Sequence, residues 1–119
     1  MIQKVDSVNF AASIVTTINA VSVVLLFDPY GPCGSVHQQS LANLEVAYLY
    51  YRQYGMLNAS FFKGDVVDRA MVEVDIKNVQ CAPSFFFYVG DGAAFTEYHR
   101  HYGVMSAEQI KYFVEQKRA

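Results

Sequence analysis

An uncharged stretch of twenty residues, Val8 to Phe27, constrains the fold of this 119-residue chain more than any other feature. About 20 apolar residues in succession can cross a bilayer as a helix. Polar residues interrupt this stretch, however, and no cluster of basic residues flanks it as at the end of a membrane span. We therefore expect no membrane segment and divide the stretch near Asn19 into a helix and a strand. The interrupting residues are Asn9, Ser13, Thr16, Thr17, Asn19 and Ser22.

The two halves of the stretch carry different hydrophobic patterns. Apolar residues recur at helical spacing after Ser7, which suits an N-cap, and predict an amphipathic helix. Val21 to Phe27 is apolar on both faces, as is typical of a central strand that is covered on both sides. Ile2 to Asp6 predicts an earlier short strand, so we expect a parallel pairing with a crossover. The helical positions are Val8, Ala11, Ile14 or Val15, and Ile18.

The rest of the chain alternates between helical and strand patterns. A long helix is predicted from Gly34 to Tyr54, since no proline or further glycine interrupts it, and Gly55 suits its C-cap. Its inward face is expected to carry Val36, Leu41, Leu44, Ala47 or Tyr48, and Tyr51. The other predicted elements are a strand around Ser60 to Phe62, a helix from Asp68 to Val79, a strand from Ser84 to Val89, a turn at Gly90 to Gly92, a returning strand from Ala94 to Tyr102, and a last helix opened by the capping box Ser106 to Gln109. This order implies one α/β domain over residues 1–119, with a mixed central sheet flanked by helices.

The junction between the uncharged strand and the long helix reads Asp28-Pro29-Tyr30-Gly31-Pro32-Cys33-Gly34. The first N–H groups of a helix have no partner within the helix, and the helix dipole is positive there. A thiol at this point has its thiolate form favoured. Dithiol exchange needs one thiol that attacks a disulfide and a second that resolves the mixed disulfide. Cys33 supplies one thiol, and Tyr30 stands where its partner in a Cys-x-x-Cys pair would be.

Tyr30-Gly31-Pro32-Cys33 after an apolar strand resembles the Trp-Cys-Gly-Pro-Cys site of the thioredoxin family. Further along, Cys81-Ala82-Pro83-Ser84-Phe85 resembles the cis-proline segment of that family and the start of the strand that follows it. Gly90-Asp91-Gly92 is similar to the family's hairpin, and Gly103 to the glycine before its last helix. These features occur in the family's order over nearly the whole chain. The resemblance implies a thioredoxin-like fold.

The resemblance also implies a degenerate active site. Tyr30 replaces the attacking cysteine, and Cys33 keeps the place of the resolving cysteine. Val24 stands where the family has a buried carboxylate that relays protons to the resolving thiol, and Gln38 stands where it has a helix-kinking proline. We expect Pro83 to be cis, which would expose the backbone groups of Ala82 to an extended peptide.

Alternatives stay open for each residue of this corner. Cys33 is either an inert buried thiol or a reactive thiolate, since the helix start favours ionisation and burial opposes it. Tyr30 either forms a contact beside Pro83 or shields Cys33 from solvent. Cys81 is either a bystander or an exposed thiol that can be glutathionylated or pair with another chain. A disulfide between Cys33 and Cys81 would need Cα atoms within about 7 Å, and we expect the two thiols to stay apart.

The C-terminal turns of the long helix are rich in aromatic residues. Either this end packs against its own loop, or it forms an exposed surface for a partner, because Tyr and Arg are favoured in interface hot spots. The residues concerned are Tyr48, Tyr50, Tyr51, Arg52 and Tyr54.

Composition and motifs exclude several classes of function. The net charge is −2 with scattered Lys and Arg, so neither a nucleic acid nor an anionic membrane is an expected partner. His99 and His101 alternate on one strand face but have no third ligand nearby in sequence, and His37 has no evident acid or base partner, so we expect no metal and no cofactor. Two cysteines and the lack of a signal-peptide pattern favour a reducing, cytoplasmic location.

Two functional hypotheses follow. The first is a redox-inactive thioredoxin-like protein that binds a protein or peptide through Tyr30, Gly31, Pro32 and the Ala82-Pro83 edge, with the tyrosine-rich helix end as a second surface and homodimerisation as an option. The second is a single-thiol disulfide oxidoreductase that uses Cys33 or Cys81, with glutathione, in cell redox homeostasis. The loss of both the attacking cysteine and the carboxylate favours the first hypothesis.

Overall fold

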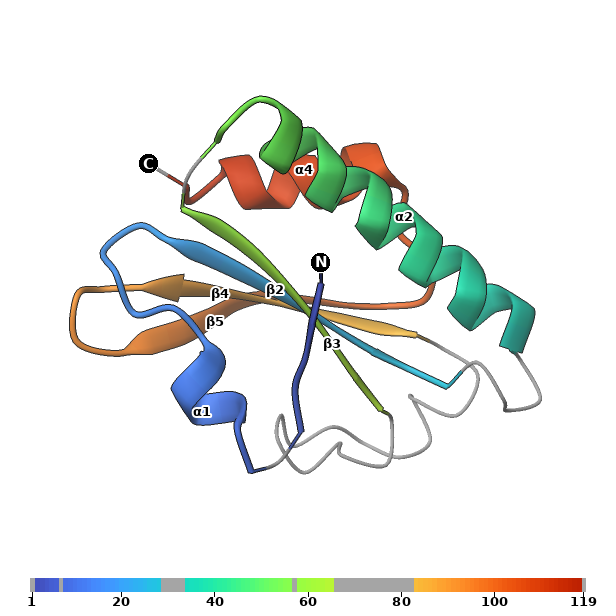
Figure 1. Ribbon diagram of the computed structural model, residues 1–119, viewed down its shortest axis with the longest axis horizontal. Coiled ribbons are helices and arrows are strands. Elements are labelled where there is room, and N and C mark those ends of the chain that lie inside the picture. The colour runs from blue at the N-terminus through green and yellow to red at the C-terminus, as the bar shows by residue number, and fades with distance from the viewer. Residues whose placement is uncertain (1, 7, 29–33, 57, 66–82, 119) are drawn as a thin grey trace.

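The computed structural model describes residues 2–6, 8–28, 34–56, 58–65 and 83–118 (Figure 1). In chain order, its elements are β1 (Gln3–Lys4), α1 (Phe10–Ser13), β2 (Val21–Phe27), α2 (Gly34–Gln53), β3 (Ala59–Asp65), β4 (Ser84–Gly90), β5 (Phe95–Tyr102) and α4 (Ala107–Glu115). The helix predicted from Asp68 to Val79 lies outside the described residues.

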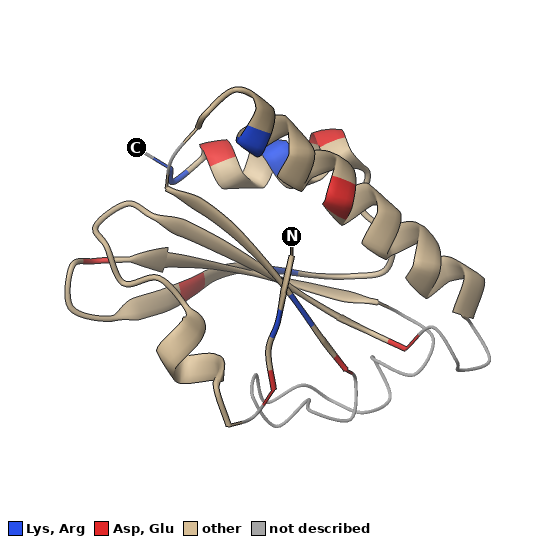
Figure 2. Cartoon of the chain, viewed as in Figure 1, with Lys and Arg blue, Asp and Glu red and all other residues tan. Residues whose placement is uncertain are grey.

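The strands form one mixed sheet in the order β1-β3-β2-β4-β5. β3 runs parallel to both β1 and β2, whereas β4 runs antiparallel to both β2 and β5. β2 lies at the centre because its residues are buried on both faces from Val21 to Leu26. Neither β2 nor its neighbour β4 carries a charged residue (Figure 2). The mixed sheet with flanking helices confirms the predicted fold class.

Alternating residues of β2 belong to two separate cores. Val23 and Leu25 face a core that is closed by α2 and α4, which lie together over one face of the sheet (Figure 1). Val24 and Leu26 face a smaller core that contains Phe10 of α1. The uncharged strand therefore stabilises both layers, because its apolar side chains on each face are removed from water.

The helix predicted after Ser7 is wrong in its start and its length. α1 is a single turn, and the carboxylate of Asp6 accepts bonds from the N–H groups of Val8 and Asn9, at 2.8 and 3.0 Å. Val8 and Ile18, which were expected to face inward, are 92% and 62% exposed. The β-branched run Val15-Thr16-Thr17 disfavours helix, because these side chains lose rotamer freedom against the preceding turn.

The segment after α1 packs closely on the end of β4. The Gly90 N–H donates to the Ala20 carbonyl at 2.9 Å, and the Gly90 carbonyl accepts from Asn19 at 3.0 Å. A Cβ atom at residue 90 would lie 2.3 Å from the carbonyl oxygen of Thr17. Glycine is therefore required at position 90, because two backbones approach closely there. This contact holds the N-terminal end of β2 against the β4–β5 hairpin.

α2 confirms the predicted long helix but corrects its inward face. Val36 is partly exposed, and the stripe that faces the core begins instead with His37 and continues through Ser40, Leu44, Ala47 and Tyr51. The helix ends as predicted, because Gly55 has φ +63° and its N–H donates to the Arg52 carbonyl.

The C-terminal part of the chain follows the prediction closely. β4 and β5 form a hairpin in which the Asp91 carboxylate accepts from the N–H groups of Ala93 and Ala94. The capping box is present, since the Ser106 hydroxyl accepts from the Gln109 N–H and the Gln109 side chain accepts from the Ser106 N–H. No helix in the described ranges combines the length and the apolar character that a bilayer crossing needs.

Candidate functional site

The sheet topology places the end of β2 and the start of β4 at the same end of the sheet. β2 ends at Phe27, and α2 begins at Gly34 on the side where β4 begins. The last pair of the β2–β4 ladder joins Leu26 to Ser84. Phe27 and Pro83, which extend that pair by one residue on each strand, are therefore neighbours. The segment 29–33, which the sequence predicts to form the corner, lies outside the described residues.

Most of the predicted site residues lie outside the described residues: Tyr30, Gly31, Pro32, Cys33, Cys81 and Ala82. Their exposure, the reactivity of the two thiols and the cis geometry of the bond between residues 82 and 83 stay predictions. Pro83 itself is buried, and its carbonyl accepts a 2.7 Å bond from the Gly103 N–H. Gly103 has φ +109°, a conformation that favours glycine. The hydrogen bond from this glycine holds the backbone of Pro83 in place.

His37 joins the end of β2 to the first turns of α2. Its Nδ1 atom accepts a 2.8 Å bond from the Asp28 N–H, and the residue is 1% exposed. Burial lowers the pKa of His37, while the nearby Asp28 carboxylate opposes this effect. The imidazole is therefore neutral at pH 7, with its proton on Nε2. That buried Nε2 atom has no hydrogen-bond partner among the described residues.

Sequence reasoning missed the importance of His37. A search for an acid or base partner in the sequence finds none, because the partner of Nδ1 is a main-chain N–H group. The signal that could have found it is the spacing of the buried stripe of α2. His37, Ser40, Leu44, Ala47 and Tyr51 recur at alternating steps of three and four residues, which is the period of a helix face.

The same arrangement of strands and helices occurs in known proteins. A structure of chloroplastic thioredoxin z covers 97% of this chain and 92% of its own, with a TM-score of 0.60 and 17% identity. Thioredoxin f2 of Chlamydomonas reinhardtii covers 98% and 95%, with a TM-score of 0.59 and 12% identity. The Malassezia sympodialis thioredoxin Mala s 13, described as a member of a pan-allergen family, covers 100% and 92%, with a TM-score of 0.62 and 18% identity.

The chain has the thioredoxin fold. No protein-family model matches the sequence, and no curated protein matches it either. The likeness is one of architecture, since the sequence identities are low. What the corner does within the thioredoxin fold therefore depends on the residues of this chain.

Val24 lies in the smaller core, on the face of the sheet that α1 covers. It is 0% exposed, and the β-ladders place Phe62 of β3 and Phe86 of β4 on either side of it. The remaining members of this core, Val5, Phe10, Ile14, Leu26 and Tyr88, bring no carboxylate to it. The valine side chain cannot exchange a proton with a thiol, and the members of this core among the described residues bring no carboxylate to it.

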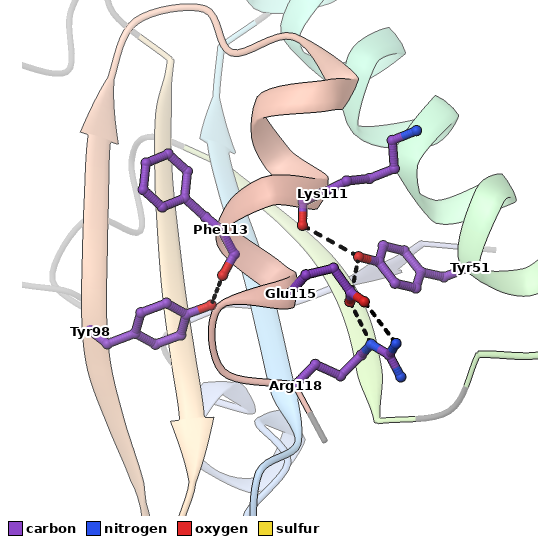
Figure 3. Close-up of polar contacts among 6 residues, drawn as sticks. All are labelled: Tyr51, Tyr98, Lys111, Phe113, Glu115 and Arg118. Carbon is purple, nitrogen blue, oxygen red and sulfur yellow. Dashed lines mark hydrogen bonds and ion pairs between the residues drawn. The ribbon is translucent and has the colours of Figure 1, made fainter.

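The tyrosine-rich end of α2 divides into a buried and an exposed part. Tyr51 is 2% exposed, and its hydroxyl donates to Glu115 Oε2 of α4 at 2.9 Å (Figure 3). Tyr48 packs edge-on against Phe61 of β3, whereas Tyr54 is 63% exposed. Tyr51 and Tyr48 therefore pack within the fold, but against α4 and β3 and not against the loop that follows the helix, and Tyr54 remains exposed.

The carboxylate that accepts from Tyr51 also forms an ion pair with Arg118. Glu115 binds the Arg118 guanidinium, with Nη2 and Oε1 at 2.8 Å (Figure 3). The pKa of Glu115 is lowered mainly by this guanidinium and further by the Tyr51 hydroxyl, while burial opposes the shift. Burial and the Glu115 carboxylate raise the pKa of Tyr51, so its hydroxyl stays protonated and donates.

His99 and His101 lie on β5 without a metal-binding environment. The His99 ring stacks on Phe113 of α4, with centroids 3.8 Å apart. Burial lowers the pKa of His99, His101 lowers it further, and Glu97 opposes them. Among the described residues, no three His, Cys, Asp or Glu side chains come together as ligands. His99 is thus a neutral packing residue between β5 and α4.

Proposed function

We propose that this thioredoxin-fold protein is a binding module with a degenerate active site and no dithiol oxidoreductase activity. A protein or peptide partner would lie along the corner formed by Tyr30, Gly31, Pro32 and Cys33 and along the Ala82-Pro83 edge. The register that makes Phe27 and Pro83 neighbours supports a common surface for these two segments. The module would act in a reducing compartment such as the cytoplasm, where both thiols stay free.

One observation carries the proposal. Val24 is completely buried among apolar side chains, and the resemblance to thioredoxins implies that a redox-active site would carry a proton-relaying carboxylate at this position. A carboxylate at position 24 would lose its hydration without gaining a hydrogen-bond partner among the described residues of this core. The core around Val24 therefore suits an apolar side chain. Together with Tyr30 in the sequence, this removes two of the three groups that dithiol chemistry would use.

Insulin reduction tests the proposal, because precipitation of the reduced chains is followed as turbidity. The wild type, Tyr30→Cys and Cys33→Ser are compared with dithiothreitol as reductant. We expect the wild type and Cys33→Ser to match the uncatalysed rate and Tyr30→Cys to exceed it, since a thiol at a helix start is favoured as thiolate. Turnover by the wild type that Cys33→Ser abolishes would overturn the proposal.

A second candidate function is supported by His37. Its buried Nε2–H group lacks an acceptor among the described residues, and Cys33 lies four residues earlier in the sequence. A thiolate accepts such a bond, which would lower the pKa of the thiol. The thiolate would attack a substrate disulfide, forming one S–S bond as the other breaks, and glutathione thiolate would then displace the protein thiolate from the mixed disulfide.

The pH dependence of alkylation by iodoacetamide separates the two functions. In a Cys81→Ser background, a single-thiol enzyme should label Cys33 rapidly at pH 7, and His37→Gln should move the midpoint of labelling to higher pH. A binding module should give slow labelling in both proteins. Cys33→Ser in the same background provides the unlabelled baseline.

A further inference from the structure

A cleft lies between α2 and the outer edge of the sheet, away from the corner. It has a volume of about 340 Å³ and is lined by Ile2, Glu45, Tyr48, Leu49, Arg52 and Lys63. Four of these residues share one face of α2, because their spacing of three, four and seven residues repeats with the helix turn. Ile2 and Lys63, from the β1–β3 edge, form the opposite wall.

The cleft concentrates positive charge on a chain whose net charge is −2. Arg52 and Lys63 belong to no ion pair within the described part of the chain, and Arg52 Nη1 reaches only the Tyr48 hydroxyl, at 3.4 Å. Lys4 is the register partner of Lys63, so both side chains lie on the same face of the sheet. Figure 2 shows the basic positions of β1 and β3 side by side. An anion in this cleft would meet Arg52 and Lys63 without displacing an acidic partner that the described residues supply.

Apolar surface continues out of the cleft along α2. Leu49 is 55% exposed, and Val46, three residues earlier on the same helix side, is 54% exposed. A ligand that places an anion between Arg52 and Lys63 can therefore bury an adjoining apolar group on Leu49 and Val46. Glu45 also lines the cleft, so an anion is favoured beside Arg52 and Lys63 and disfavoured beside Glu45.

We propose that this cleft binds an acidic segment of a partner polypeptide. One carboxylate would lie between Arg52 and Lys63, and the neighbouring apolar side chain would cover Leu49 and Val46. A polypeptide fits better than a small anion because the exposed apolar surface extends beyond the cleft itself. This inference rests on the proposed function, because it assumes that the chain is a binding module. The cleft, however, is a different surface from the corner of Tyr30 to Cys33.

The probe is the peptide acetyl-Gly-Leu-Glu-Asp-Phe-Gly-amide, titrated into ¹⁵N-labelled protein and followed by amide chemical shifts. We expect shifts in Tyr48, Leu49 and Lys63 that weaken as NaCl is raised from low to about 0.5 M, since charges at a surface are screened by salt. A control peptide with Gln and Asn in place of the acids should bind at least fivefold more weakly. A second control with Gly in place of Leu and Phe tests the apolar part.

Charge variants identify the cleft as the binding surface. Arg52→Gln with Lys63→Gln should raise Kd about tenfold, since each partly exposed charge contributes modestly. Lys117→Gln is the matched control, because it removes a cation near Tyr98 that does not line the cleft, and it should change Kd less than twofold. Glu45→Gln should tighten binding, which no loss of folding could imitate.

Three outcomes would overturn the inference: no shifts at millimolar peptide, equal losses in the cleft variants and in Lys117→Gln, or weaker binding by Glu45→Gln. Tyr30→Ala separates the cleft from the corner. If Tyr30→Ala abolishes binding while the cleft variants keep it, the peptide uses the corner, so the proposed function stands and the cleft inference fails. If the double cleft variant weakens binding about tenfold and Tyr30→Ala does not weaken it, the peptide binds the cleft and not the corner, so the cleft inference is supported independently of the corner.

Discussion

The Tyr98 hydroxyl donates a 2.6 Å hydrogen bond to the main-chain carbonyl of Phe113 (Figure 3). In a continuing helix that carbonyl would accept from Lys117, but the Lys117 N–H bonds to Val114 instead. Tyr98 therefore caps the C-terminal end of α4 and attaches it to β5. Tyr98 is also the extra residue of the bulge in the β4–β5 ladder, where His99 pairs with Phe87 and Glu97 with Tyr88. The bulge changes the direction of the Tyr98 side chain, whose hydroxyl bonds to the C-terminal end of α4.

Replacing Tyr98 with Phe should lower the free energy of unfolding by about 1 kcal/mol, because the Phe113 carbonyl loses its partner while the packing ring remains. Urea denaturation at pH 7 measures this change. Tyr112→Phe is the matched control, since Tyr112 is 63% exposed and its hydroxyl makes no hydrogen bond with the described residues. Equal effects from the two substitutions would show that the capping bond is not significant.

Gly90→Ala should be strongly destabilising, by about 3 kcal/mol, because the added methyl group would overlap the backbone of Thr16 and Thr17. Gly55→Ala is the comparison, since Gly55 has φ +63° but no atom within 4 Å of an added Cβ, and it should cost about 1 kcal/mol. Thermal and urea unfolding measure both. A Gly90→Ala protein as stable as Gly55→Ala would contradict the close approach.

Stability should fall as the pH is lowered from 7 to 5. His37 and His99 both have lowered pKa values in the folded protein, so the unfolded chain binds protons more readily below its ordinary histidine pKa of 6.5. The loss begins as pH falls through 6.5 and ends once the folded-state pKa values have been passed. His99→Phe should reduce the slope while keeping the stack on Phe113. Urea denaturation at several pH values provides the test, and a flat profile would be inconsistent with buried neutral imidazoles.

Oxidation should produce dimers linked through Cys81, as the sequence predicts for an exposed thiol. Sedimentation with reductant and after peroxide treatment measures the change. Cys81→Ser should remain unlinked, whereas Cys33→Ser should still dimerise. Dimers that depend on Cys33 would place the reactive thiol at the corner instead.

The sequence predicted the central features of the fold because they depend on strong local patterns. Val21 to Phe27 is apolar at every position except Ser22, and only a strand buried on both faces can use such a run in a thin domain. The break after Tyr54 is equally local, since Gly55 takes the left-handed conformation that other residues avoid. The pattern of Val8, Ala11 and Ile14 misled because the β-branched run that follows α1 disfavours further helical turns, although the apolar spacing continues.

The candidate site was harder to predict because its described groups act through the main chain. His37 is bonded to the N–H of Asp28, and Pro83 to that of Gly103, and neither partner is identified by its side chain. Val24 could be interpreted from the sequence only through the resemblance to thioredoxins. The apolar environment that surrounds it comes from Phe62 and Phe86, which are distant in sequence.

The pairing of β2 also has a consequence for synthesis of the chain. Both ladders of this strand are made with later segments: Val21 pairs with Ala59 and with Val89. Because a ribosome adds about 5–20 residues per second, the most apolar strand emerges several seconds before its last partner. During that interval it presents unpaired backbone and apolar side chains together, which is the form that chaperones bind and that aggregates. Production of this protein should therefore depend on chaperone supply more than its final stability suggests.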